Sequence, residues 1–148
     1  MASTFRQTAS FGKRQEYSAI ARMLREGLDV YMTLVDDRGI DCVVRKGPTA
    51  YLDVQIKARS RDVPPKNAAR FAAMDVDDPR PSYFFVFYSE RLDKYWVMPS
   101  LDVVKLAYRN KSGKNAGRYS LSLSGLRSGK PYPKSEFAQF EEAFYLLA

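Results

Sequence analysis

The segments GIDCVV at residues 39–44 and YLDVQIK at residues 51–57 decide the fold of this chain. Both are short and bounded by turn residues, and polar and apolar residues alternate in the second, which predicts two neighbouring β-strands. Because successive side chains of a strand point to opposite faces, Gln55 and Lys57 lie on one face and their apolar neighbours on the other. We therefore expect a compact polar pocket over an apolar sheet, made by Asp41 on one strand and by Gln55 and Lys57 on the next.

The sequence before these strands predicts a helix and a further strand. The helix covers residues 12–27, has Glu16 in its first turn and ends at Gly27. Its apolar residues at helical spacing are Tyr17, Ile20, Ala21, Leu24 and Leu28. The strand covers residues 28–35 and leads through a tight turn at residues 36–39 into the Asp41 strand. The result is a helix followed by three antiparallel strands.

The rest of the sequence predicts a second group of strands and helices. The expected elements are a proline-rich connection at residues 59–81 with a short helix at residues 67–74, strands at residues 83–88 and 95–98, a helix capped by Ser100, a basic loop at residues 109–117, a strand at residues 119–123 and an amphipathic helix at residues 135–147. This order, α-β-β-β-(α)-β-β-α-β-α, predicts a single α/β (α+β) domain over residues 1–148 with a central mixed sheet of about five strands flanked by helices.

The composition excludes several kinds of catalytic site. The chain contains no histidine, which rules out a Ser-His-Asp triad, a Cys-His pair and a His-ligated zinc site. Its single cysteine, Cys42, can form neither an intrachain disulfide nor a site of several thiolates, and we expect it to be buried as a small hydrophobe. Carboxylates, Lys, Tyr, Ser and a hard metal held by oxygen ligands are the remaining catalytic groups.

The charge of the chain favours a polyanionic partner. The net charge is +7, and a basic surface attracts nucleic acid. The expected nucleic-acid contacts are Lys13, Arg14, Arg59, Arg61, Lys111 and Lys114, with Arg59 the first choice for a phosphate contact because it follows Lys57 on the same face. The sequence contains neither an apolar run long enough for a membrane span nor a secretory signal, so we expect a cytoplasmic protein with no membrane partner.

Four residues form the set on which a functional hypothesis depends: Glu16, Asp41, Gln55 and Lys57. Over residues 13–100 the chain resembles the PD-(D/E)xK nuclease superfamily, the restriction-endonuclease-like fold, and its small members such as Holliday junction resolvases and some homing endonucleases. In that superfamily a helix supplies a glutamate, one strand an aspartate and the next strand the (D/E)-x-K element. The resemblance assigns these roles to Glu16, to Asp41 and to Gln55-x-Lys57.

The resemblance implies a metal-dependent endonuclease that hydrolyses phosphodiester bonds, most simply in DNA. The implied ligands of Mg²⁺ or Mn²⁺ are Asp41, the Gln55 side-chain oxygen and the Ile56 backbone carbonyl, with Glu16 acting through water or on a second ion. Lys57 would orient the attacking water and neutralise developing charge. A chain of this size carries one site, so cutting both strands of a duplex would require a homodimer or a higher homo-oligomer.

Gln55 departs from the superfamily pattern, and other interpretations stay open. The amide of Gln55 offers an oxygen ligand without a charge, and Asp53, two residues earlier on the same face, is expected to lie too far away to replace that charge. One alternative is a weak or inactive nuclease fold that binds nucleic acid without cutting it, and another is an interaction or accessory module. Each residue also has an ordinary explanation: Glu16 is favoured near a helix N-terminus, Asp41 in a turn and Gln55 and Lys57 on a solvated strand face.

Overall fold

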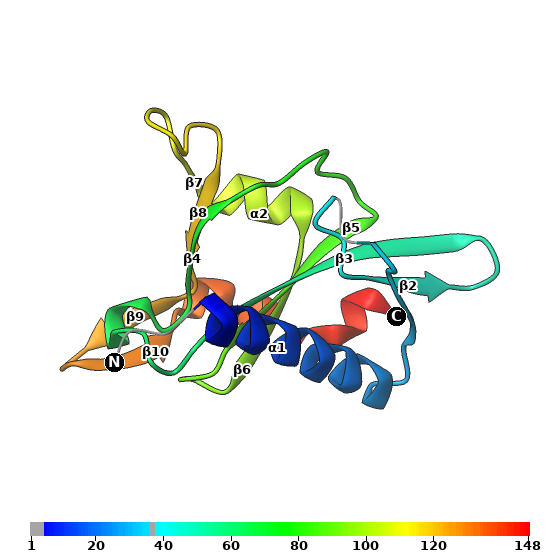
Figure 1. Cartoon of the computed structure of the whole chain (residues 1–148), viewed down its shortest axis with the longest axis horizontal. Coiled ribbons are helices and arrows are strands. Elements are labelled where there is room, and N and C mark those ends of the chain that lie inside the picture. The colour runs from blue at the N-terminus through cyan, green and yellow to red at the C-terminus, as the bar shows by residue number, and fades with distance from the viewer. Residues whose placement is uncertain (1–4, 36–37) are drawn as a thin grey trace.

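The computed structural model describes residues 5–35 and 38–148 and contains a five-stranded mixed sheet at its centre. The strands are β1 (Asp29–Met32), β2 (Cys42–Lys46), β3 (Ala50–Arg59), β5 (Tyr83–Ser89) and β6 (Lys94–Pro99), in the spatial order β1-β2-β3-β5-β6. Strands β3 and β5 are parallel, and the other neighbours are antiparallel. The helix α1 (Phe5–Arg25) runs beside this sheet (Figure 1). The expected fold class, an α+β domain with a mixed sheet of five strands, is confirmed.

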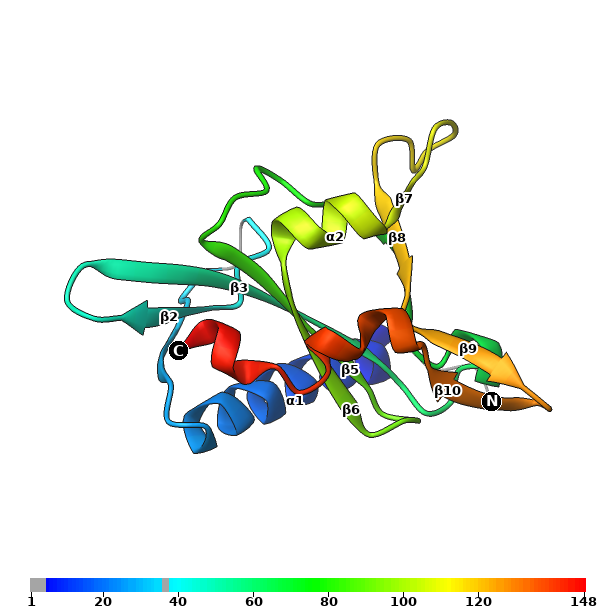
Figure 2. The same cartoon turned by 180° about the vertical axis from the view of Figure 1, so that it is seen from behind.

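A second group of strands packs beside the central sheet. Strands β4 (Arg70–Met74), β8 (Tyr119–Ser122) and β7 (Tyr108–Arg109) form a three-stranded antiparallel sheet, and β9 (Ser124–Arg127) and β10 (Lys130–Pro133) form a separate hairpin. The remaining elements are the helix α2 (Ser100–Leu106) and three 3-10 helices, η1 (Pro65–Asn67), η2 (Ser135–Phe140) and η3 (Phe144–Leu147). Figure 2 shows α2 beside the upper part of the three-stranded sheet, and the β9–β10 hairpin extending away from the molecule.

Apolar side chains cover both faces of the central sheet. On one face, residues of α1 and η3 form a core with β2 and β3; its members include Ala19, Met23, Cys42, Val54 and Phe144. On the other face, the second sheet and η2 form a core with β5 and β6; its members include Phe71, Phe85, Phe87, Trp96 and Leu121. Strand β5 contributes to both cores, which explains why it is apolar along nearly its whole length.

The first helix differs from its prediction in its start and in its buried face. It begins at Phe5, so Glu16 lies in the middle of the helix and not in its first turn. Ile20 is buried as expected, but Tyr17 is 53% exposed and Leu24 55% exposed. The sheet instead contacts the stripe that contains Ala19 and Met23, because the small Ala19 side chain allows close approach.

The end of the helix and two later segments also bear on the sequence analysis. Gly27 has a φ of +83° and ends α1 as predicted, with the Leu28 N–H bonded to the Met23 carbonyl at 3.1 Å. The turn predicted at residues 36–39 falls partly outside the described residues. Ser100 does not cap α2: its hydroxyl instead bonds the backbone N–H and carbonyl of Arg80, both at 3.0 Å.

Two predicted helices are wrong. The segment at residues 67–74 forms the end of η1 and the strand β4, because Arg70 and Phe71 pair with β8. The segment at residues 135–147 is not one amphipathic helix but the two 3-10 helices η2 and η3, separated where Glu142 adopts a φ of +52°. Within the described ranges, no helix combines the length and the apolar character that a membrane span requires.

Candidate active site

Asp41 lies at the point where β2 separates from β3. The last register pair of the two strands is Cys42 with Val54, and the Asp41 N–H donates to the Val54 carbonyl at 2.9 Å. Its carboxylate then accepts a hydrogen bond from the Ile56 N–H, with 2.6 Å between Oδ2 and N. The Asp41 carboxylate therefore accepts the Ile56 N–H bond that a backbone carbonyl would accept if β2 continued. Asp41 itself precedes β2 and does not lie within the strand, contrary to the prediction.

The Ile56 carbonyl points toward this same junction. Odd-numbered residues of β3 bond to β5, as the Asp53 N–H to Ser82 carbonyl bond (2.8 Å) and the Glu90 N–H to Arg59 carbonyl bond (2.9 Å) show. Because backbone groups alternate along a strand, Ile56 directs its N–H and its carbonyl toward the β2 side. Since β2 begins only at Cys42, the Ile56 carbonyl lies beyond the last strand pair, on the same side of β3 as the Asp41 carboxylate.

Gln55 and Lys57 share one face of β3, as the alternation predicted. Leu52, Val54 and Ile56 are buried, whereas Asp53, Gln55 and Lys57 are half-buried. The Gln55 amide lies against Gly39, where an added Cβ would be 3.1 Å from Nε2, and Gly39 has a φ of +71°. Lys57 forms no hydrogen bond or ion pair with any residue that the structure describes. Its ammonium is thus uncommitted on the strand face that it shares with Gln55.

Tyr83 orients the Gln55 side chain and is not among the site residues predicted from the sequence. The Tyr83 hydroxyl donates to Gln55 Oε1 at 2.7 Å, and burial raises the pKa of Tyr83 to about 12, so the phenol keeps its proton. The Arg80 guanidinium lies 5.0 Å from the centre of the Tyr83 ring and forms an ion pair with Asp53. Asp53 is therefore paired with Arg80 and does not replace the charge missing at Gln55.

A signal for Tyr83 was present in the sequence. The aromatic run at residues 83–88 reads as core, and Phe85 and Phe87 are core. Tyr83 differs from them because a buried tyrosine hydroxyl needs a hydrogen-bond partner. The parallel register that pairs Asp53 with Tyr83 and Gln55 with Phe85 brings that partner within reach, and this register could not be read from the sequence.

Glu16 and Lys13 belong to one turn of α1. Lys13 Nζ lies 3.0 Å from Glu16 Oε2, and this bond raises the pKa of Lys13, with a smaller contribution from Asp41. Burial raises the pKa of the Cys42 thiol to about 12, and the charges of Asp41 and Glu16 add to the rise. Both carboxylates thus act on Cys42, at the start of β2. Cys42 is fully buried, which confirms its expected role as a small hydrophobe.

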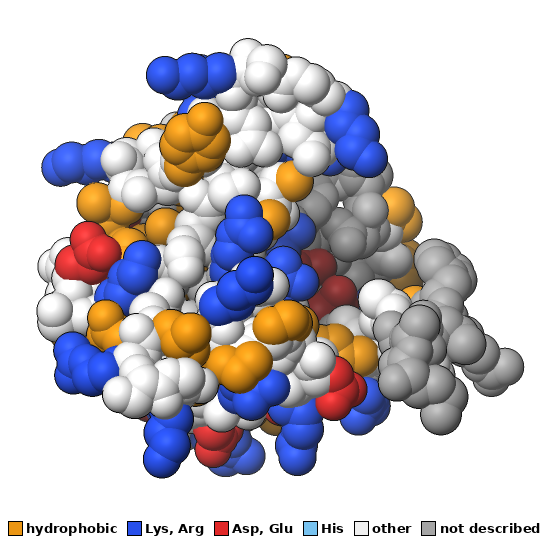
Figure 3. Space-filling view, turned by 90° about the vertical axis from the view of Figure 1, so that its left-hand side faces the viewer, with side chains coloured by type: hydrophobic (Ala, Val, Ile, Leu, Met, Phe, Trp, Pro, Cys, Tyr) orange, Lys and Arg blue, Asp and Glu red, His pale blue; other side chains and the backbone are white. Residues whose placement is uncertain are grey.

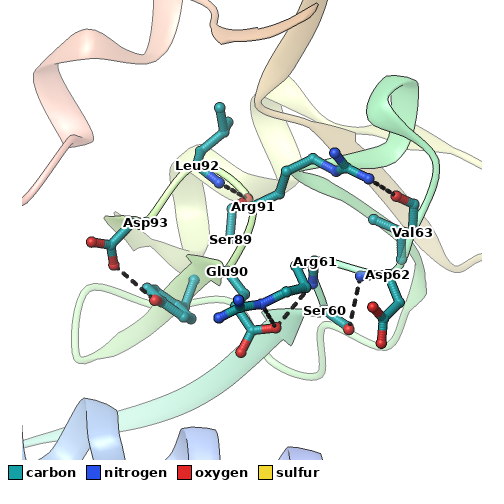
Figure 4. A network of polar contacts seen from close by, with 10 residues as sticks. Ser60, Arg61, Asp62, Val63, Ser89, Glu90, Arg91, Leu92 and Asp93 are labelled. Atoms are coloured by element: carbon teal, nitrogen blue, oxygen red, sulfur yellow. Dashed lines mark hydrogen bonds and ion pairs between the residues drawn. The ribbon is translucent and has the colours of Figure 1, made fainter.

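The cations expected to contact nucleic acid differ in their surroundings. Arg59 Nε donates to the Arg70 carbonyl at 2.5 Å, and burial, followed by the charge of Arg70, lowers the pKa of Arg59. Arg61 pairs with Glu90 at 3.2 Å, within the polar network between the two turns that Figure 4 shows. Arg14 is exposed beside the Phe11 ring. Lys111 and Lys114 are exposed in the loop between β7 and β8.

The donor atoms at the junction are hard oxygens. They belong to two carboxylates, Asp41 and Glu16, one amide, Gln55, and one backbone carbonyl, Ile56. The described ranges contain no group of three or more His, Cys, Asp or Glu side chains able to hold a metal. Mg²⁺ is commonly bound through one or two carboxylates together with substrate phosphates, so this small donor set fits such an ion.

Comparisons with known proteins bear on the fold. No protein-family model and no curated protein matches the sequence. The solved structure of a bacterial homing endonuclease is similar, with 21% identity, 92% of this chain and 89% of that chain covered, and a TM-score of 0.58. A Holliday junction resolvase from Archaeoglobus fulgidus matches with 13% identity, 75% and 83% of the two chains covered, and a TM-score of 0.49. Together with the strand order, the first similarity shows that the chain has a restriction-endonuclease-like fold.

Proposed function

We propose that this protein is a metal-dependent endonuclease that hydrolyses phosphodiester bonds of DNA. The observation that carries the proposal is the hydrogen bond from the Ile56 N–H to Asp41 Oδ2 at 2.6 Å. It holds a carboxylate at the end of the β2–β3 ladder, on the side toward which the Ile56 carbonyl points, and next to the strand face of Gln55 and Lys57. The nuclease fold supports the same reading.

Three oxygen donors would hold the divalent cation, Mg²⁺ or Mn²⁺: the Asp41 carboxylate, Gln55 Oε1 and the Ile56 carbonyl. The chemistry that the cation supplies when bound is activation of a water molecule and polarisation of a phosphate oxygen. Glu16 is tied to Lys13 and would act through water or on a second ion. Gln55 Oε1 already accepts from Tyr83, and a carbonyl oxygen has a second lone pair for a further partner.

Lys57 would act on the scissile phosphate. Its ammonium has no partner among the described residues, so no ion pair must break before it approaches a phosphate. A positive charge at that place stabilises the negative charge that develops as the water attacks, and its N–H groups can orient the water.

The second candidate is a protein of nuclease fold that binds nucleic acid without cutting it. The pairing of Glu16 with Lys13 and the neutral Gln55 favour it, because the first offsets one negative charge of the set and the second supplies none. Such a protein would keep salt-sensitive DNA binding. An accessory module would show no such binding.

Cleavage of supercoiled plasmid in Mg²⁺ or Mn²⁺ tests the proposal. We expect cleavage by the wild type, none in EDTA and none by Asp41→Ala. Asp29→Ala is the matched control, because Asp29 is exposed on β1 and away from the β2–β3 junction. DNA binding by the wild type without metal-dependent cleavage would establish the second candidate, and absence of salt-sensitive binding would favour the accessory module.

A further inference from the structure

The positive charge of the chain is concentrated in one segment. Residues 103–135 contain eight of the 24 Lys and Arg residues and none of the 17 Asp and Glu residues. The eight are Lys105, Arg109, Lys111, Lys114, Arg118, Arg127, Lys130 and Lys134. The rest of the chain holds 16 basic and 17 acidic residues, so the excess of positive charge comes entirely from this segment.

After the end of α2, which carries Lys105, this segment forms two projections on one side of the molecule. In Figure 1 the loop between β7 and β8 rises at the upper left of the molecule, and the β9–β10 hairpin extends to the lower left. Figure 3 views that side directly and shows Lys and Arg side chains from its upper to its lower edge, with few acidic ones. Of the eight cations, only Arg118 pairs with a carboxylate among the described residues, that of Asp75 at 3.2 Å. The charge is therefore largely available to a partner.

The β9–β10 hairpin is built as a rigid ribbon with a basic tip. Ser128 and Gly129 have φ values of +50° and +75°, the two left-handed residues of a tight two-residue turn. Arg127 and Lys130 are paired on either side of this turn, and both are exposed. The Tyr132 ring lies over Gly125, where a Cβ would be 2.7 Å away, and the Arg127 guanidinium lies 4.8 Å from the centre of that ring. These contacts shape the hairpin and its tip from within.

Hydrogen bonds connect the base of the hairpin with the strand that carries the candidate site. The Ala69 carbonyl accepts from the Leu123 N–H at 2.9 Å, and the Ala69 N–H donates to Ser124 Oγ at 3.0 Å. The next residue, Arg70, accepts from Arg59 Nε. Arg59 follows Lys57 on the same face of β3, so the hairpin has a fixed attachment two residues beyond the candidate site.

We propose that the β9–β10 hairpin enters the major groove of B-form duplex DNA, with Arg127 and Lys130 contacting base edges and phosphates. The choice of partner rests on the proposed function. The major groove of B-DNA admits a two-stranded β-ribbon, whereas that of A-form RNA is too deep and narrow for side chains to read. The exposed Lys111 and Lys114 of the other projection contact the phosphate backbone alongside.

Binding without cleavage tests the inference. The probes are a short labelled DNA duplex and an RNA duplex of the same sequence, measured by fluorescence anisotropy in EDTA over a series of salt concentrations. Arg127→Ala with Lys130→Ala should weaken DNA binding at least about tenfold and lower the slope of log K against log salt by about two. The matched control, Arg25→Ala with Lys46→Ala, removes the same charge from exposed positions at the other end of the molecule and should change neither value.

Each outcome decides one point. Loss of DNA binding by the hairpin variant, together with loss of dimethyl sulfate protection at guanine N7 in the major groove, supports the inference, even if the wild type proves unable to cleave. If the hairpin variant binds DNA with wild-type affinity, the inference is overturned and the proposed cleavage is unaffected. Equal binding of the RNA duplex and the DNA duplex has the same two consequences. Because both substituted side chains are exposed, thermal unfolding should be unchanged, which separates lost contacts from lost folding.

Discussion

The candidate site and the two basic projections use charge in opposite ways. At the site, most polar groups are held by the fold: Asp41 by the Ile56 N–H, Gln55 by Tyr83 and Asp53 by Arg80. On the projections, Lys111, Lys114, Arg127 and Lys130 are exposed and have no carboxylate partner in the described chain. Hydrolysis of a phosphodiester requires groups that are already oriented. Attraction of a polyanion requires cations that no carboxylate neutralises. The difference predicts that cleavage and binding can be changed separately.

The largest expected effect is a difference in stability between substitutions in the core beside the site and on the hairpin. Phe85 is fully buried between the central and second sheets, so Phe85→Ala should lower the free energy of unfolding by about 3–5 kcal/mol. Arg127→Ala, on the exposed hairpin tip, should change it by less than about 0.5 kcal/mol. Urea unfolding followed by circular dichroism measures both. A large loss of stability in Arg127→Ala would show that the hairpin supports the core and is not an independent arm.

The next effect concerns Lys57. Lys57→Ala should lower the cleavage rate by about 10²- to 10³-fold, because charge stabilisation at the phosphate is lost. Affinity for duplex DNA should stay within about twofold of the wild type. Lys46→Ala, an exposed lysine at the end of β2, is the control and should alter neither value. Equal losses of cleavage and binding in Lys57→Ala would end the distinction between the two regions.

The third effect is the pH dependence of stability that the buried thiol of Cys42, next to Asp41, should produce. Burial raises the pKa of Cys42 to about 12, so the native state keeps a proton that the unfolded state releases above its ordinary pKa of 9.0. Below pH 9.0 the thiol therefore does not change the free energy of unfolding. As the pH rises from 9.0 toward 12, this group lowers the free energy of unfolding by about 1.4 kcal/mol per pH unit. Urea unfolding at a series of alkaline pH values should show a shallower decline in Cys42→Ala. An unchanged decline would mean that the thiol does not contribute.

The smallest effect concerns the orientation of Gln55. Tyr83→Phe removes one hydrogen bond, of about 1 kcal/mol, and should weaken Mn²⁺ binding about fivefold in calorimetry. The effect should vanish in a Gln55→Ala background, since the hydroxyl then has no amide to orient. Tyr88→Phe is the control, because its hydroxyl bonds Asp93 instead. A Tyr83 effect that persists without Gln55 would assign the tyrosine a packing role only.

The strands of the central sheet could be predicted from the sequence. The alternation at residues 51–57 reflects burial of one strand face, and the aromatic run at residues 83–88 reflects burial of both faces. It failed at residues 67–74, where two alanine pairs favour a helix, but pairing with β8 forms a strand. The phenylalanine spacing at residues 135–147 fits α-helical and 3-10 turns alike. The bond of Tyr83 to Gln55 depends on the parallel register of β3 and β5, which local patterns do not contain. The β9–β10 hairpin is local, and its Ser128-Gly129 turn is a sequence signal that the predicted elements left out.

The most direct test of a cation site at the β2–β3 junction is anomalous diffraction from crystals grown with Mn²⁺ and a DNA duplex. We expect a manganese peak with the Asp41 carboxylate, Gln55 Oε1 and the Ile56 carbonyl among its ligands, and loss of that peak in Asp41→Ala. Absence of manganese from the junction, or a peak bound only at carboxylates elsewhere such as Asp53 and Asp78, would contradict the account.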